Sequence, residues 1–350
     1  MGVVFLGDVS LSPGADPALP SGFPSFDSPA VANLEGPILD LAASTSGVWN
    51  SPIVLGFLAR CHVRAVTLAN NHITDLGAQL SDTRARLDKA GIGSFGAGST
   101  RAEAATPLLL EAEGVTVALL GFGWDVIGCL PPRTSQGGVN LLRPAQVIAA
   151  VADLRRSRPT IHIAVFMHWN YEGEIYPQPA HRQLAFAAIE AGADAVVGCH
   201  PHCVQGIEFH RGAPIAYSLG NWFLPWGSFW GGELAYPDFM RRQLAFEWDP
   251  RSGSTICHWY EYEPSSHALH FLGQEPAVQS AAVHELTPFA GMSHRDYKIW
   301  FRGHRRKRRL LPVYDDMDDD KLNFAKDRLV ISRQKLIDAA VRLGLKGGPR

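Results

Sequence analysis

The chain has 350 residues, of which 46 % are hydrophobic and 19 % are charged, and its formal net charge is −2. This balance is typical of a globular protein with a sizeable core and excludes an intrinsically disordered chain. The nearly neutral charge gives no electrostatic reason to expect nucleic acid as a partner.

The early part of the chain alternates short apolar runs with helical patterns. The apolar runs predict strands at 3–6, 31–34, 65–69 and 92–95, a hairpin at 107–121, and strands at 161–167 and 195–197. Helical spacing predicts helices at 52–60, 75–90, 144–156 and 180–191. Residues rich in Gly and Pro predict loops at 11–29 and 122–142.

The later part of the chain favours hairpins and then helices. The patterns predict a hairpin at 206–217, strands at 244–248 and 256–262, and helices at 275–286 and 328–345. We therefore predict an α/β fold with two sheets packed as a sandwich. The predicted catalytic domain covers residues 1–272, and a mostly helical C-terminal extension, residues 273–350, is expected to pack on it.

Cysteines and apolar runs bear on the cellular location. The five cysteines include no Cys-x-x-Cys pair, which favours reduced thiols in a cytoplasmic protein. The start of the chain, with Val3–Leu6 as its first apolar run, lacks the pattern of a signal peptide. No run reaches the roughly 18 apolar residues that a transmembrane helix needs. We expect a cytoplasmic protein with no membrane partner.

Seven polar residues lie where a predicted strand meets a loop. They are Asp8, Glu35, Asn71, His72, His168, His200 and His202. Taken singly, an Asp after a strand is typical of a turn cap, and a His there is typical of a structural hydrogen bond. Strand ends on one edge of a sheet converge, so the seven together favour a metal centre. Oxygen and nitrogen ligands without a thiolate suit Mn²⁺, Fe or Zn²⁺.

Seven segments between residue 3 and about residue 223 form an ordered and specific set. They are Gly7-Asp8, Asn33–Pro37, Leu68–His72 with Asp75 and Gly77, His168-Trp169 with Glu172, Gly192–Asp194, Gly198–His202, and Tyr217–Asn221. In this order they resemble the CapA family, the poly-γ-glutamate capsule proteins. The resemblance implies a calcineurin-like metallophosphatase fold, in which the α/β sandwich holds metal ions at one end.

The resemblance also implies which residues bind metal. The site would hold one or two divalent ions, Mn, Fe, Zn or Ca. The implied ligands are Asp8 and His202 for one ion, Asn71, His168 and His200 for the other, and Glu35 between them. His72 would be the acid beside the metals. Two positions depart from the usual phosphatase pattern: Ser10 stands where the first motif has a histidine, and Glu35 replaces the bridging aspartate.

Two reactions suit such a site. A pair of ions about 3.5–4 Å apart suits phosphoester hydrolysis. A single ion that acts as a Lewis acid suits exchange of a Cα proton, which inverts the carbon centre. The candidate proton carriers are Asp8, His72, Glu172 and His294. Soluble members of the family resemble peptide epimerases of natural-product pathways. We therefore favour epimerisation over hydrolysis, with a peptide or glutamyl-type substrate.

Two further features have alternative interpretations. A peptide-binding protein with a relic metal site is the non-enzymatic alternative. In that alternative, an aromatic cluster would form the wall of the peptide-binding surface, although packing in the core explains the cluster equally well. The cluster is Trp222, Trp226, Phe229 and Trp230.

The basic run at 302–309 precedes an acidic run at 315–320. The basic run could bind nucleic acid or an acidic leader peptide, but we interpret it as a solvated helix face neutralised by these acids.

Overall fold

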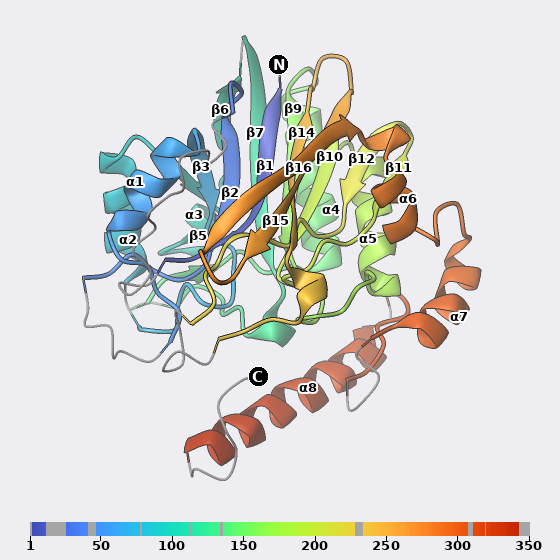
Figure 1. The fold of residues 1–350 in the computed structure, drawn as a ribbon. Coiled ribbons are helices and arrows are strands. Elements are labelled where there is room, and N and C mark those ends of the chain that lie inside the picture. Colours follow the sequence, from blue (N-terminus) through green and yellow to red (C-terminus); the bar gives the residue numbers. More distant parts are fainter. Residues whose placement is uncertain are drawn as a thin grey trace.

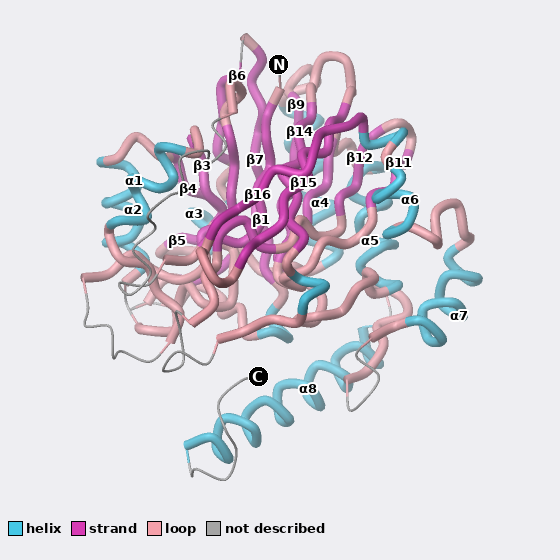
Figure 2. Tube along the Cα trace, viewed as in Figure 1, coloured by secondary structure: helices cyan, strands magenta, loops and turns pink. Residues whose placement is uncertain are grey.

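Two β-sheets face each other, and helices cover their outer faces (Figure 1). The structure is a computed structural model. It describes residues 2–11, 26–40, 47–77, 79–112, 114–133, 136–227, 234–306, 311–318 and 320–342. Figure 2 shows the strands gathered in the middle of the molecule and the helices around them. The predicted two-sheet α/β sandwich is confirmed.

The first sheet is organised around β1, the strand that carries Asp8. Its order is β16-β15-β14-β1-β2-β3-β4, and β13 also pairs with β1. The strands are β1 Val3–Val9, β2 Ala30–Leu34, β3 Val63–Thr67, β4 Gly93–Phe95, β13 Asn221–Phe223, β14 Arg242–Trp248, β15 Thr255–Glu263 and β16 Ala268–Pro276. β1 to β4 run parallel, so their carboxyl ends lie on one edge of the sheet.

The second sheet has the order β11-β12-β10-β9-β7-β6. Its strands are β6 Leu108–Ala112, β7 Val115–Gly123, β9 His162–His168, β10 Ala195–Cys199, β11 Ile207–His210 and β12 Ala213–Ala216. β7, β9, β10 and β12 run parallel, and both predicted hairpins are present as antiparallel pairs at the edges. A separate pair joins β5, Ala97–Gly98, to β8, Gly138–Val139.

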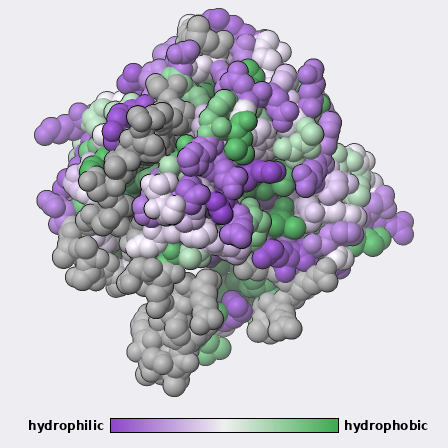
Figure 3. Space-filling model, in the orientation of Figure 1, coloured by the Kyte–Doolittle hydropathy of each residue, from purple (hydrophilic) through white to green (hydrophobic). Residues whose placement is uncertain are grey.

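One hydrophobic core lies between the two sheets. Phe5 of β1 and Phe166 of β9 meet there with ring centroids 6.0 Å apart, among other buried apolar side chains. Both strands are covered on two faces, which explains why they read as continuous apolar runs and not as alternating patterns. The face of the molecule seen in Figure 3 is mostly hydrophilic, with separate hydrophobic patches.

Helices cover the outer face of each sheet and form two further clusters. Their bounds are α1 Ile53–Arg60, α2 Leu80–Lys89, α3 Arg101–Ala105, α4 Pro144–Ser157 and α5 Pro179–Glu190. α1 and α2 pack on the first sheet, and α4 and α5 pack on the second. The predicted helix at 75–90 begins later than expected, because Asp75–Gly77 form a turn in which Asp75 hydrogen-bonds His72.

The C-terminal part begins inside the first sheet. Strand β16 pairs with β15 and crosses the boundary predicted at residue 272. The helix predicted at 275–286 is therefore shorter, α6 at Ala281–Leu286, because residues 275 and 276 end the strand. The remaining helices are α7, His294–His304, and α8, Asp320–Arg342. Tyr297 and Val330 from these helices are buried in the cluster outside the second sheet.

The basic run at 302–309 is only in part the solvated face that we expected; residues 307–309 lie outside the described part of the chain. Arg302 pairs with Asp315 at 2.6 Å, as the nearby acidic run predicted. Arg305, in contrast, is buried, with its Nε 3.7 Å from Glu174 Oε2. This contact fastens the C-terminal part to the loop after β9.

Other expectations concern cysteines, membrane spans and aromatic residues. All five cysteines are free and buried. Among the described residues, no helix combines the length and the apolar composition needed to cross a bilayer. Trp222 is fully buried and packs against Phe26 and Tyr260, so it belongs to the core. Phe229 and Trp230 of the same predicted cluster lie outside the described residues.

Candidate metal centre

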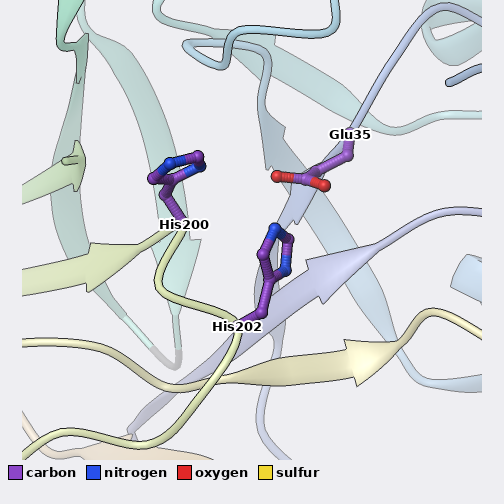
Figure 4. Close-up of side chains that lie close together, drawn as sticks. All are labelled: Glu35, His200 and His202. Atoms are coloured by element: carbon purple, nitrogen blue, oxygen red, sulfur yellow. The ribbon is translucent and has the colours of Figure 1, made fainter. Parts of the chain in front are cut away.

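The carboxyl ends of β1, β2, β9 and β10 meet at one end of the sandwich. Buried ligand atoms from these ends form two groups, each with its atoms within 4.8 Å of one another. One group is Asp8, Glu35 and His168, and the other is Glu35, His200 and His202. Figure 4 shows the second group, with the Glu35 carboxylate and the His202 ring pointing toward each other. Glu35 is common to both groups.

Two glycines allow the strand ends to approach so closely. A Cβ atom on Gly7 would lie 2.0 Å from the carbonyl oxygen of Gly220. A Cβ atom on Gly198 would lie 2.0 Å from the carbonyl oxygen of Tyr217. Real Cβ atoms do not come this near to backbone, so any larger residue at either position would push the strand ends apart.

Asp8 is fully buried and held by a hydrogen-bond network. Its Oδ1 accepts a 2.7 Å hydrogen bond from Asn33 Nδ2, and its Oδ2 accepts one of 3.2 Å from the His200 backbone N–H. His202 Nδ1 lies 3.3 Å from the same Oδ2. Burial raises the pKa of Asp8, and the neighbouring His202 opposes this only in part. A cation beside the carboxylate would offset the cost of burying its charge.

His168 faces both Asn71 and Glu35. Its Nε2 lies 2.8 Å from Asn71 Oδ1 and 3.5 Å from Glu35 Oε1. Its Nδ1 lies 3.3 Å from Asn33 Nδ2. Burial, together with the nearby His200 and His202, lowers the pKa of His168 well below its usual range. The ring is therefore neutral at physiological pH, which is the form that binds metal.

His200 and His202 occupy unusual backbone conformations. Their φ angles are +96° and +57°, a region that residues other than glycine rarely adopt. Such strain is retained where the fold must hold a side chain in one place. His202 Nδ1 lies 2.8 Å from Asn221 Oδ1, and the ring stacks on Tyr236 at 5.2 Å. The Nδ1 contact fixes the ring and leaves Nε2 available as a ligand.

The pKa values of these two histidines move in opposite directions. Burial, followed by the charge of His202, lowers the pKa of His200 well below its usual range. Burial also lowers the pKa of His202, but the charges of Glu35, Asp8 and Glu172 outweigh it, and the net effect is a raised pKa. The centre therefore combines two neutral imidazoles with one that is drawn toward the cationic form by the carboxylates.

The residues present fit a bound divalent cation. Glu35 Oε1 and His200 Nδ1 are buried without a hydrogen-bond partner among the described residues. Burial and the charge of Asp8 raise the pKa of Glu35 well above its usual range. Buried polar atoms without partners destabilise a fold, and a metal ion would satisfy them. Imidazole nitrogens and carboxylate oxygens without thiolate ligands suit Mn²⁺, Fe or Zn²⁺.

The carboxylate and histidine ligands that the resemblance implied form two overlapping groups of close atoms. Asp8 lies with His168, and His202 lies with His200, while Asp8 Oδ2 also lies 3.3 Å from His202 Nδ1. Glu35 belongs to both groups, and the assignment of each ligand to an ion stays a prediction. Ser10, which stands in place of the usual histidine, is buried, and its Oγ has no hydrogen-bond partner among the described residues.

The four predicted proton carriers take different places. Asp8 is buried in the centre. His72 is half-buried beside Asn71, its Nε2 3.0 Å from Asn71 Nδ2 and its Nδ1 2.7 Å from Asp75 Oδ2. Glu172 is exposed, yet its charge acts on Glu35 and His202. His294 begins α7, where its Nε2 pairs with Asp316 Oδ1 of the following loop at 2.9 Å, and it belongs to neither group of ligand atoms.

Sequence reasoning did not assign a role to several residues of the centre. Asn33 bonds both Asp8 and His168, and Asn70 Nδ2 in turn donates to Asn33 Oδ1 at 3.1 Å. Asn221 contacts His202, as described above. All three stand within strand-end motifs beside predicted ligands, so their position was a usable signal. Tyr236 lies in a loop outside these motifs, and nothing in its surroundings marked it.

Known proteins are similar to parts of this chain. A solved structure of a hypothetical protein from Thermus thermophilus is 17 % identical, with a TM-score of 0.41 and coverage of 79 % of this chain and 98 % of that chain. The PGA biosynthesis protein CapA of Bacillus subtilis (strain 168) is 35 % identical over 162 residues, which are 45 % of this chain and 42 % of the relative.

A second relative and a family complete these comparisons. The capsule biosynthesis protein CapA of Bacillus anthracis is 32 % identical over 166 residues, which are 46 % of this chain and 40 % of the relative. The matched part thus spans less than half the length of both CapA proteins. The family described as bacterial capsule synthesis protein PGA_cap matches residues 4–224, more than half of the chain and the part that carries every residue of the metal centre except Tyr236. The chain belongs to the bacterial capsule synthesis protein family PGA_cap.

Proposed function

We propose that the chain is a metal-dependent enzyme and that its first candidate reaction is phosphoester hydrolysis. The observation that carries this proposal is the position of Glu35, a buried carboxylate shared by two groups of ligand atoms. A divalent ion supplies a nucleophile at neutral pH by lowering the pKa of bound water, and it polarises a phosphoryl group. A site with ligands on both sides of one carboxylate suits this chemistry.

The residues of the chain have separate tasks in this proposal. Asp8, Glu35, His168, His200 and His202, with Asn71, would hold the metal. Burial lowers the pKa of His168 and His200 and keeps both neutral, so they need not lose a cationic proton before binding. Asn33 and Asn221 fix the orientations of Asp8 and His202 through the hydrogen bonds described above.

His72 is the proposed proton donor to the leaving oxygen. It lies next to Asn71 at the edge of the centre and is partly open to solvent, unlike the buried ligands. Asp75 Oδ2 lies 2.7 Å from its Nδ1 and so fixes the plane of the ring. A carboxylate behind an imidazole is a common way to orient an acid, because it accepts a hydrogen bond from Nδ1–H and favours the imidazolium form whose Nε2 proton is donated.

The proposed substrate is a phosphorylated derivative of an acidic polymer of glutamyl type, because the unmodified polymer contains no phosphoester bond to hydrolyse. The names of the two CapA relatives, a PGA biosynthesis protein and a capsule biosynthesis protein, support a polymer substrate. The exposed Glu172 beside the centre would repel a carboxylate that came too close. This repulsion favours binding in which the polymer's carboxylates face away from that edge.

Epimerisation at a Cα atom, the reaction favoured from the sequence, is the second candidate. Its supporting observation is Glu172, an exposed carboxylate near the centre that suits a proton acceptor on the solvent side. The names of the two relatives state a role in biosynthesis and specify neither reaction. Both reactions need the same metal ligands, so only the product separates them.

One experiment distinguishes these reactions. The protein is stripped with a chelator, reloaded with Mn²⁺, Zn²⁺ or Fe²⁺, and incubated in D₂O with a phosphomonoester, a phosphodiester and a glutamyl peptide. We expect release of phosphate or alcohol that depends on metal and is lost in His200→Ala. Deuterium at a Cα atom without phosphoester cleavage would reject hydrolysis in favour of epimerisation. Failure to bind any divalent ion would reject both and support the peptide-binding alternative.

A further inference from the structure

Helix α8 presents a row of leucines to the outside. Leu322, Leu329 and Leu336 are 47 %, 58 % and 72 % exposed, although they belong to a regular helix of 23 residues. They are seven residues apart, so each lies two turns after the last, and the row drifts by only ~20° at each step. Single exposed leucines are ordinary, but an aligned row of three forms a continuous apolar surface.

A row of cations runs beside the leucines. Lys321, Arg328 and Lys335 each precede one of the leucines by one residue, and all three are exposed. One residue corresponds to about 100° around the helix, so the two rows share the outward side. Between residues 321 and 337, the exposed side chains include no carboxylate. The outward face of α8 is therefore both apolar and basic.

The opposite face of α8 already has partners. Asp327 Oδ1 accepts a 2.7 Å hydrogen bond from Tyr314 Oη, and Asn323 Nδ2 donates one of 2.8 Å to the Asp316 carbonyl oxygen. Val330 is buried in the cluster outside the second sheet. These contacts fix which side of the helix points away from the protein. The leucine row is thus not the stripe that attaches α8 to the rest of the molecule.

We propose that this outward face binds the surface of an anionic lipid bilayer. The leucines would enter the boundary between headgroups and acyl chains, and the cations would meet anionic headgroups. A second copy of the chain fits less well, because pairing two leucine rows would leave the cations, which lie about 100° around the helix from the leucines, without an anionic partner. A soluble polyanion would neutralise the cations but leave the leucines in water. The proposal departs from our expectation of no membrane partner.

The helix lies at the same end of the molecule as the metal centre. α8 packs against η1, Asp125–Ile127, which directly follows β7. Gly123 at the end of β7 is paired with His168, and the Trp124 backbone N–H donates to the His168 carbonyl oxygen at 2.9 Å. In Figure 1, α8 crosses the end of the molecule opposite the N-terminus. Binding through α8 would hold the centre close to the bilayer.

The test is flotation of the complete chain with vesicles of phosphatidylcholine alone or mixed with phosphatidylglycerol. We expect binding to the anionic vesicles only, weakened by salt because the cations contribute to it. Two triple variants should each reduce binding at least about tenfold. They are L322Q/L329Q/L336Q and K321Q/R328Q/K335Q. Matched controls remove the same types of exposed residue elsewhere and should bind normally: F271Q/L272Q/V278Q and R60Q/K89Q/R101Q.

Several results would overturn the proposal. The first is that the parent protein does not float with anionic vesicles. The second is that the leucine variant binds as well as the parent while soluble polyglutamate competes, which would identify a polyanion surface. The third is a leucine-dependent dimer in sedimentation. Thermal unfolding checks that the variants fold. If the triple leucine variant does not fold, the single variant Leu336→Gln replaces it in the flotation assay. Metal content and activity on a soluble substrate, measured in parallel, report on the proposed function separately.

Discussion

Asn71 Oδ1 lies 2.8 Å from His168 Nε2, although 97 residues separate them in the chain. Asn71 stands in the loop after β3 of the first sheet, and His168 ends β9 of the second. The contact therefore joins the two sheets at the end where both sets of parallel strands finish. A metal bound here would add to the polar contacts that already join the two layers, such as the hydrogen bond from the His200 backbone N–H to Asp8 Oδ2.

The first prediction concerns metal content. His168→Ala should lower the amount of Mn²⁺ or Zn²⁺ retained by the purified protein by at least half, because it removes one ligand and the partner of Asn71. Loss of one well-placed ligand typically reduces metal affinity by a factor of about ten or more. Elemental analysis after gel filtration measures the effect. His294→Ala is the matched control, since that histidine lies on α7 and pairs with Asp316 outside the two ligand groups. Equal losses in both variants would contradict the assignment.

The second prediction concerns the pair of His72 and Asp75. Asp75→Asn removes the carboxylate 2.7 Å from His72 Nδ1, so the ring loses its fixed tautomer. We expect kcat to fall about tenfold or more, with KM and metal content nearly unchanged, because His72 acts in the proton transfer and not in binding. Steady-state kinetics on a phosphoester with a good leaving group should show a smaller loss than on one with a poor leaving group. A uniform loss on both substrates would exclude the acid role.

The third prediction concerns the stability of the metal-free protein. Glu35 is buried near Asp8, and its pKa is raised well above its ordinary value of 4.5. A raised carboxyl pKa means that the fold prefers the protonated form, so ionisation destabilises the protein as pH rises from the ordinary value through the raised one. Glu35→Gln removes this charge. We expect the variant to melt at least about 2 °C higher than the metal-free parent at neutral pH.

The difference in melting temperature between Glu35→Gln and the metal-free parent should depend on pH, and this dependence tests the explanation. Below the ordinary pKa of glutamate, both proteins carry an uncharged group at position 35, and the melting temperatures should coincide. The difference should open as pH rises and then level off above the raised pKa. Added metal should reverse the order, because only the parent keeps the shared carboxylate. A variant that is less stable than the metal-free parent at every pH would show that Glu35 stabilises the fold directly.

The sequence predicted the strand ends better than the connections between them. Apolar runs bounded by glycine located β1, β9 and β10, because strands buried on both faces leave a clear signal. The same runs placed Asp8, His168 and His200 at one edge, since parallel strands end together. The predicted helix begins too early, at Asp75. A helical pattern does not show that the Asp75 side chain hydrogen-bonds His72 and so forms a turn before the helix.

Other features could not be predicted because they depend on the three-dimensional arrangement. The grouping of His200 with His202 follows from two backbone angles in the left-handed region, which periodicity does not report. Tyr236 reaches His202 from a distant loop. His294 resembled a candidate proton carrier only by residue type, and its pairing with Asp316 arises from the packing of the C-terminal helices.

The last prediction tests the close approach of the strands that forms the centre. Gly198→Ala places a Cβ atom 2.0 Å from the Tyr217 carbonyl oxygen and 2.5 Å from Trp169 Nε1, so β10 must shift. We expect a loss of about 3 kcal/mol or more in the free energy of unfolding, in line with overpacking in a tight core. Gly56→Ala is the matched control: its added methyl group meets no atom within 4 Å, and it lies within α1. The control should gain roughly 0.5–1 kcal/mol, because alanine favours a helix. Chemical denaturation of both variants, with bound metal removed, measures the two effects, and a Gly198→Ala protein as stable as the parent would show that the strand ends can separate without cost.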